Sequence, residues 1–261
     1  MGAMDRRLFF HVAILQPQIF ASLPHIRAGF STRHGGVSTA PYHTLNLGPS
    51  TGDVPERVAE NQRRFLSQLG AEPQQLALAG QVHGTRVHTV EVPGFYEGYD
   101  GLVTRKLDVV LGITVADCAA VLLADPEHGV IGACHAGWRG TVGGIVAQTI
   151  AAMESLGAHR EAIRAFISPC ISVAHFEVGP EVAALFPAEH VYTRPGQPRP
   201  YVDLKGTLNQ QLIEAGLPPT SIEVAPQCTV QHNNLFYSYR AENGTCGRMM
   251  GAITLLPFVR T

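Results

Sequence analysis

The chain has 261 residues, of which 45% are hydrophobic, enough for one large core or two small ones. Its formal net charge is −2, from 19 basic and 21 acidic residues. A broad positive surface is therefore not expected, which argues against nucleic acid or an anionic membrane as a partner. No apolar stretch approaches the ~20 residues that a membrane-spanning helix needs.

Nothing in the sequence divides it into parts, because no internal repeat or long low-complexity linker is present. We predict a single domain over residues 1–261, with residues 1–3 before Met4 interpreted as a cloning remnant. The 5 cysteines are odd in number and scattered, and they include no Cys-x-x-Cys pair. This pattern argues against a disulfide framework and favours a reducing compartment, the cytoplasm.

In chain order, the apolar run at residues 8–15 resembles a signal peptide weakly but is short and contains His11, so we predict an early strand. Residues 29–50 form a long Gly-, Ser- and Pro-rich segment, which we expect to build one wall of a binding site. A helix is predicted to begin with a capping box between Asp53 and Glu56 and to stop at Gly70.

The remaining predicted elements alternate between short strands and helices. The first strands are expected at residues 76–82, 87–92, 109–115, 119–124 and 130–135. A helix then begins near Trp138. Further strands are expected at 163–167, 222–225 and 252–256, and further helices at 180–186 and 204–215. The fold class is therefore mixed α and β, without a predicted strand order.

A hairpin signal lies between the strands that end at Ala124 and begin near Gly129. If Pro126 and Glu127 are the two central loop residues, residue 124 pairs with 129, and Cys118 pairs with His135. Directly opposed side chains have Cβ atoms about 4.5–5.5 Å apart, so one thiolate and one imidazole could share a metal ion. A one-residue slip in register would place them on opposite faces.

His83 is the best third ligand, because it follows an apolar strand and precedes a glycine that permits close approach. Three separated ligands fit a catalytic zinc with an open position. Structural alternatives stay open: His83 as a hydrogen-bonded residue and Cys118 as an inert core thiol. Asp117 either orients a ligand and handles a proton or caps a turn.

An anion site is predicted after His135, where the segment from Ala136 to Thr141 leads into a helix. Free amides there, together with Arg139, suit phosphate, although the glycines could serve packing alone and Arg139 could pair with a surface carboxylate. Near the C-terminus, residues 236–240 and 244–248 combine aromatics, arginines and glycines, which could line a pocket or belong to the core.

These segments resemble the laccase-domain purine nucleoside phosphorylases, also described as multicopper polyphenol oxidase-like proteins and, in bacteria, as peptidoglycan editing factors. The resemblance covers nearly the whole chain and rests on residues 31–38, 45–48, 81–84, 116–118, 134–140, 168–171, 176–179 and 236–248. It implies an α/β (α+β) fold with mixed β-sheets in α/β/β/α layers, similar to the cytotoxic necrotizing factor catalytic domain. It also implies His83, Cys118 and His135 as metal ligands.

The resemblance further implies phosphorolysis of adenosine, inosine, guanosine and methylthioadenosine, and deamination of adenosine. Arg33, Arg139 or Arg248 would hold phosphate, and Asn46 and Gln81 would hydrogen-bond the ribose or base. This chain departs from the family where Gln231 replaces the second cysteine of a Cys-Thr-x-Cys segment and at residues 172–175. No second metal pair is therefore expected near Cys228.

Copper oxidase chemistry is not expected, because none of the 12 histidines forms a His-x-His pair. We predict Zn²⁺, with copper as a less functional occupant. A different enzyme class uses the same pair without metal: a hydrolase or amidase with Cys118 as nucleophile and His135 as base, acting on peptidoglycan precursors. A non-enzymatic module with a structural zinc is the third reading. The oligomeric state is left open.

Overall fold

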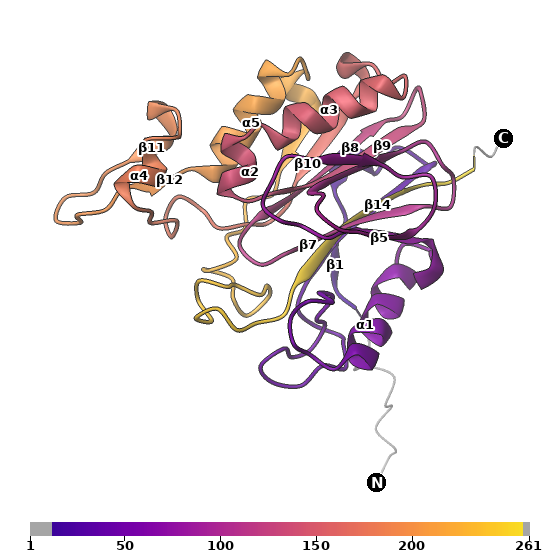
Figure 1. Ribbon diagram of the computed structural model, residues 1–261, viewed down its shortest axis with the longest axis horizontal. Helices are drawn as coiled ribbons and strands as arrows, with labels where there is room; N and C mark the ends of the chain where they lie inside the picture. Colours follow the sequence, from indigo (N-terminus) through magenta and orange to yellow (C-terminus); the bar gives the residue numbers. More distant parts are fainter. Residues whose placement is uncertain (1–11, 258–261) are drawn as a thin grey trace, which may run out of the picture.

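The computed structural model describes residues 12–257, which form two large β-sheets flanked by helices (Figure 1). The first sheet has the order β1-β2-β14-β7-β3-β5. Its strands are β1 Ile14–Leu15, β2 Ile26–Ser31, β3 Leu76–Ala79, β5 Gly94–Tyr96, β7 Val110–Val115 and β14 Met249–Leu255. The pairs from β1 to β7 are antiparallel, whereas β3 runs parallel to both β7 and β5. This sheet is therefore mixed.

The second sheet is also mixed and has the order β13-β10-β8-β9-β6-β4. Its strands are β4 Val87–Thr89, β6 Gly101–Thr104, β8 Ala119–Asp125, β9 Val130–Ala136, β10 Arg164–Ile167 and β13 Ile222–Val224. The central three pairs are antiparallel and the two outer pairs are parallel. A small separate ladder joins β11 Val191–Tyr192 to β12 Tyr201–Val202.

Helices cover the outer faces of the two sheets, which gives the predicted α/β/β/α layers (Figure 1). They are α1 Pro55–Ser67, α2 Trp138–Val142, α3 Ile145–Ser155, α4 Pro180–Ala183 and α5 Leu204–Glu214. Short 3-10 turns occupy Gln18–Phe20, Pro73–Gln75, Arg160–Ala162, Ala188–His190 and Pro219–Ser221. Helix α1 packs on the first sheet, and α3 and α5 pack on the second. None of the helices within residues 12–257 is long and apolar enough to cross a membrane.

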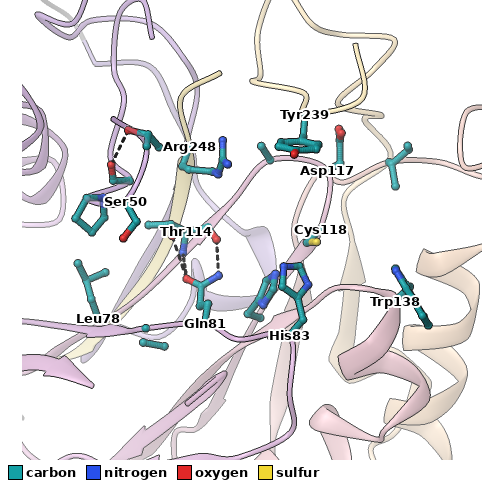
Figure 2. Close-up of a pocket in the computed structure, with 18 of the residues that line it drawn as sticks. Ser50, Leu78, Gln81, His83, Thr114, Asp117, Cys118, Trp138, Tyr239 and Arg248 are labelled. Carbon is teal, nitrogen blue, oxygen red and sulfur yellow. Dashed lines mark hydrogen bonds between the residues drawn. The ribbon is translucent and has the colours of Figure 1, made fainter. Parts of the chain in front are cut away.

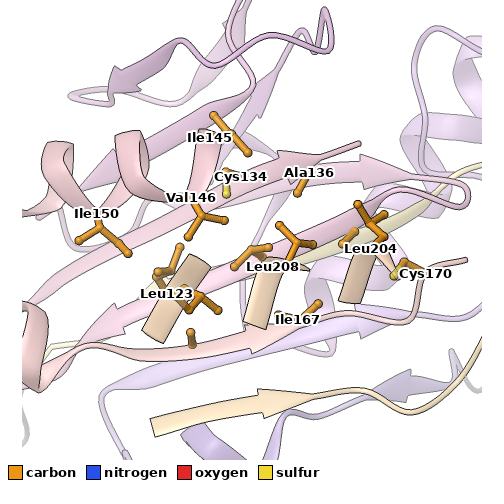
Figure 3. Close-up of a cluster of buried hydrophobic side chains, with 14 of the residues drawn as sticks. Leu123, Cys134, Ala136, Ile145, Val146, Ile150, Ile167, Cys170, Leu204 and Leu208 are labelled. Atoms are coloured by element: carbon orange, nitrogen blue, oxygen red, sulfur yellow. The ribbon is translucent and has the colours of Figure 1, made fainter. Parts of the chain in front are cut away.

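The core consists of three apolar layers between these elements, and strand β8 shows how they form. Alternate residues of β8, such as Val121 and Leu123, pack under α3 and α5, as Figure 3 shows for Leu123. Leu122 and its alternating neighbours pack instead between the two sheets. Because both faces are buried, β8 and β9 appear in the sequence as continuous apolar runs without polar alternation.

The β8–β9 hairpin was predicted correctly, but its register was wrong by two positions. Asp125 pairs with Val130 and Ala120 pairs with His135, so the loop is longer than the predicted two central residues. Cys118 lies just before β8 and is not directly opposite His135. The error preserves the face because side chains alternate with a period of two residues. Both side chains point into the space between the sheets.

Other predictions were wrong locally. The Asp53 cap is absent, because α1 begins after Val54 without a side-chain cap and Asp53 instead bonds Ser38 and Asn46. The helix predicted from Trp138 is broken into α2 and α3 at Gly144, whose φ is 80°. Strands β2, β5, β6, β11 and β12 were not predicted. Residues 8–11 of the predicted early strand lie outside the described residues, and of residues 12–15 only Ile14–Leu15 form a strand, β1.

Candidate active site and metal centre

His83, Cys118 and His135 converge in the folded chain, and Figure 2 shows His83 beside Cys118. Their ligand atoms all lie within 4.8 Å of one another, and within residues 12–257 they are the sole His, Cys, Asp and Glu group with this arrangement. His83 follows β3, Cys118 lies between β7 and β8, and His135 is the penultimate residue of β9. The structure therefore brings together the three residues singled out from the sequence.

The loops that carry these ligands have an unusual backbone. His83 and Asp117, which precedes Cys118, both have positive φ angles, 60° and 80°. Such angles are uncommon outside glycine and concentrate at functional sites. Gly137 lies beside both ligands, and a Cβ there would meet the Cys118 Sγ and the His83 Nδ1 at 2.9 Å each. A side chain at this position would therefore fill the space where the three ligands meet.

Asp100 organises the site and was missed by the sequence analysis. It is fully buried and accepts hydrogen bonds from the backbone N–H groups of residues 82, 83 and 84, at 3.1, 3.0 and 2.7 Å. Its Oδ1 also lies 2.8 Å from the Nδ1 of His135. One carboxylate thus holds the His83 loop and, with Nδ1 donating, leaves the Nε2 of His135 free for a metal ion.

The electrostatics of the site favour a bound cation. Burial opposes protonation of His135, but the neighbouring Cys118 charge and the Asp100 hydrogen bond outweigh it and raise the His135 pKa to about 9. Burial and the proximity of His135 lower the pKa of His83. Binding of a metal ion by His135 therefore competes with binding of a proton.

The donor set fits zinc. One thiolate and two imidazoles are the nitrogen and sulfur ligands that zinc takes, and three protein ligands are the number found at catalytic zinc sites. The side chains are close enough for small rotations to bring them onto one ion. The Asp100 bond to His135 is the outer support that metal-binding histidines commonly have.

A cavity of about 520 Å³ opens beside the three ligands. Its volume lies in the range of small-molecule sites. The loop at residues 48–51 forms part of its wall, as predicted for the segment 29–50. The remaining lining residues are Leu78, Ala79, Gly80, Gln81, Phe95, Thr114, Ala116, Asp117, Trp138, Ile171, Phe176, Leu204, Tyr239, Arg240 and Arg248, together with the three ligands.

Three of the other predicted site residues line this cavity: Gln81, Asp117 and Arg248. The Gln81 amide is held by Thr114, donating to its carbonyl at 2.7 Å and accepting from its N–H at 2.9 Å. The Asp117 carboxylate accepts from the Thr229 hydroxyl at 2.6 Å and from the Arg240 N–H at 2.7 Å. Asp117 therefore ties two distant loops to the site, as a turn residue does.

Arg33, Asn46 and Arg139 lie outside the cavity lining. Arg33 is buried, pairs with Glu242 at 3.1 Å and lies over the Tyr237 ring. Asn46 is fully buried and supports the cavity wall from behind, because its Oδ1 accepts from the N–H groups of Gly48 and Arg248. Arg139 is exposed and lies over the Trp138 ring, with 4.3 Å from its Cζ to the ring centroid.

Comparison with known proteins identifies one family and relatives that share one name. The family model described as multi-copper polyphenol oxidoreductase laccase matches residues 27–256. A Deinococcus radiodurans protein named purine nucleoside phosphorylase is 45% identical over 238 residues, covering 90% of each chain. A Corynebacterium glutamicum protein of the same name is 39% identical over 238 residues, covering 88% of this chain and 94% of the relative.

Solved structures agree with this result. The crystal structure of YlmD from Geobacillus stearothermophilus has a TM-score of 0.87 and 31% identity, covering 95% of this chain and 99% of that chain. The Bacillus licheniformis hypothetical protein YfiH also has a TM-score of 0.87, with 30% identity, and covers 94% of this chain and 97% of that chain. The chain belongs to the multi-copper polyphenol oxidoreductase laccase family.

Proposed function

We propose that this protein is a zinc-dependent purine nucleoside phosphorylase that acts on adenosine, inosine, guanosine and methylthioadenosine and also deaminates adenosine. The observation that carries the proposal is the set of three ligands, His83, Cys118 and His135, at the wall of a cavity large enough for a small molecule. The names of the curated relatives support the purine nucleoside phosphorylase activity. The five unpaired cysteines fit the cytoplasm as its compartment.

Phosphorolysis needs a site that holds a nucleoside and an anion together. A phosphate oxygen forms a bond to the ribose C1′, the bond from C1′ to the purine N9 breaks, and the purine leaves with the electron pair and a proton. The cavity offers apolar surface for a base, including Trp138 and Phe95, and positive charge on Arg240 and Arg248. It therefore contains groups of the types that each reactant requires.

A zinc ion held by His83, Cys118 and His135 would supply a Lewis acid within the cavity. Asp100 would keep the His135 ring in its ligating orientation. In deamination, water replaces the amino group of adenosine and gives inosine and ammonia. Because both reactions use a purine nucleoside, one cavity can serve both.

The test is to incubate metal-quantified protein with inosine and phosphate. Hypoxanthine and ribose 1-phosphate are expected in equal amounts, and a reaction without phosphate is the control. Adenosine without phosphate should give inosine and ammonia. Protein treated with a chelator should lose both activities and regain them with Zn²⁺. Absence of ribose 1-phosphate from fully metal-loaded protein would rule out the phosphorylase.

A second candidate, a cysteine hydrolase or amidase acting on peptidoglycan precursors, is favoured by one observation. Asp100 bonds the Nδ1 of His135, and His135 in turn bonds Cys118, which forms a Cys-His-Asp chain. Such a chain activates a thiol nucleophile in other enzymes. This function predicts full turnover in chelated protein and a covalent substrate adduct on Cys118. The phosphorylase predicts neither result.

A further inference from the structure

The two arginines of the cavity are used differently. Arg240 donates through Nη1 to the His175 carbonyl at 3.2 Å and through Nη2 to the Glu177 carbonyl at 3.1 Å. Its backbone N–H is bound by Asp117. Both terminal nitrogens of Arg240 thus already have partners, so this residue fastens a loop to the cavity rim.

Arg248, in contrast, has guanidinium hydrogen-bond donors without partners within residues 12–257. Its Nη1 donates to the carbonyls of Cys246 and Gly247, at 2.8 and 3.0 Å. Within residues 12–257 its Nη2 and Nε have no hydrogen-bond partner, and no carboxylate forms an ion pair with it. Arg33 differs, because its charge is paired with Glu242. Arg248 therefore brings into the cavity a positive charge that no carboxylate within residues 12–257 neutralises, with the Tyr239 ring centroid 5.7 Å from its Cζ.

The backbone around Arg248 holds this charge in place. Its N–H donates to the Asn46 Oδ1 at 2.9 Å, and its carbonyl accepts from the Leu47 N–H at 3.0 Å. Gly48 packs against its stem so closely that a Cβ there would lie 2.6 Å from the Arg248 Cγ. A guanidinium fixed in this way binds an oxyanion without a large loss of side-chain entropy.

Different side chains line the two sides of the cavity. Figure 2 shows Arg248 and Ser50 on one side, Trp138 on the other, and His83 and Cys118 between them. In a displacement at the ribose C1′, the entering phosphate and the departing purine occupy opposite faces of that carbon. Arg248 lies on the Ser50 side, with the Tyr239 ring centroid 5.7 Å from its Cζ, whereas Trp138 lies beyond His83 and Cys118. A phosphate at Arg248 and a purine at Trp138 would therefore approach the ribose from opposite sides.

We propose that Arg248 is the phosphate anchor of this cavity, and that the purine lies on the side of Trp138 and the metal ligands. This proposal rests on the proposed phosphorylase function. Arg248 holds the phosphate while one phosphate oxygen forms a bond to C1′ of the ribose. The C1′–N9 bond breaks, and its electron pair and the phosphate proton pass to the purine. Its guanidinium binds the remaining phosphate oxygens.

The experiment compares Arg248→Met and Arg248→Lys with Arg240→Met in metal-loaded protein. Arg248→Met should raise the KM for phosphate by roughly 10- to 100-fold, the usual effect of losing a charge-assisted hydrogen bond. The KM for inosine should change by less than about threefold, because the base and ribose contacts remain. Arg248→Lys keeps the charge without the fork, so its KM for phosphate should be intermediate. Arg240→Met should raise it least.

Direct titration with inorganic phosphate separates this proposal from the phosphorylase itself. Binding can be followed by calorimetry without nucleoside, with metal content and melting temperature measured for each variant. Weaker phosphate binding by both Arg248 variants supports the anchor even if inosine is not cleaved, an outcome that sinks only the proposed function. An active wild type whose folded Arg248 variants keep its phosphate KM and affinity overturns the anchor. If Arg248→Met fails to fold, Arg248→Lys decides.

Discussion

Asp100 and Asp125 lie at opposite ends of the second sheet. Each carboxylate accepts hydrogen bonds from the same kinds of donor, three backbone N–H groups and one histidine ring. Asp100 binds three consecutive backbone N–H groups and the Nδ1 of His135. Asp125 binds the backbone N–H groups of Glu127, His128 and His159 and the Nδ1 of His128, at 2.8 to 3.0 Å. Both carboxylates are fully buried. In each case hydrogen bonds outweigh burial and lower the pKa.

The two sites differ in what surrounds the histidine ring. His128 is 36% exposed in its side chain and stacks on His159, with ring centroids 4.2 Å apart. His135 is 4% exposed and faces His83 and Cys118. An aspartate–histidine pair alone is therefore a way to fasten a turn. At His135, two further side chains from other loops, His83 and Cys118, lie close enough to the same ring to form the proposed metal site.

Removal of the Cys118 thiolate should have the largest effect on this difference. Cys118→Ser should lower zinc affinity by more than about 100-fold, because loss of an outer hydrogen bond alone typically costs 10- to 100-fold. Inosine phosphorolysis should fall with it. Cys134→Ala is the matched control, because Cys134 is a fully buried core thiol whose pKa burial raises to about 12. If metal titration showed that Cys118→Ser binds zinc as tightly as the wild type, Cys118 would not be a ligand of the proposed metal site.

Replacement of each aspartate tests whether the two pairs have separate roles. Asp100→Asn should lower zinc affinity by about 10- to 100-fold, because Asn offers one acceptor oxygen for four donors and weakens the hold on His135. Asp125→Asn should leave zinc affinity unchanged and lower the free energy of unfolding instead. Competition with a chelating dye measures the affinity, and urea unfolding measures the stability. If Asp100→Asn and Asp125→Asn had equal zinc affinities, the two aspartate–histidine pairs would not have separate roles.

The proximity of Cys118 and His135 could be predicted because its signals are local, whereas His83 was chosen as the third candidate mainly through the family resemblance. The hairpin turn and the period of two residues placed Cys118 and His135 on the same face, even with the register wrong by two positions. The apolar runs of β7, β8 and β9 were visible for the same reason, since strands buried on both faces are continuously hydrophobic. The short strands β5 and β6 carry too few residues for such a pattern.

What escaped prediction depends on tertiary contacts. Asp100 precedes a short strand as many turn aspartates do, and its role appears only when residues 82–84 and His135 fold around it. Arg33 and Asn46 belong to motifs of the family resemblance, yet their polar atoms face Glu242 and the loop behind the cavity. The spatial order of the strands likewise depends on pairing between residues far apart in the sequence, which local sequence patterns do not predict.

His128→Ala should have the smallest effect and shows what the turn pair contributes. Loss of the ring's bond to Asp125 should cost about 0.5–1.5 kcal/mol of stability at pH 7, because three backbone donors remain. These donors also remain to hold the Asp125 pKa below its ordinary value, with the His159 N–H contributing most. A carboxylate with a lowered folded pKa stabilises the protein above its unfolded pKa of about 3.9, and that stability is lost as pH falls through the folded value.

Metal-free wild type and His128→Ala should therefore both lose stability as the pH falls below about 4, with Asp125→Asn losing less in that range. Urea unfolding between pH 3 and pH 7 measures the three curves. If His128→Ala removed the acid-dependent loss as fully as Asp125→Asn, the ring and not the backbone would hold the carboxylate. The turn pair would then depend on its histidine as strongly as the proposed metal site depends on His135.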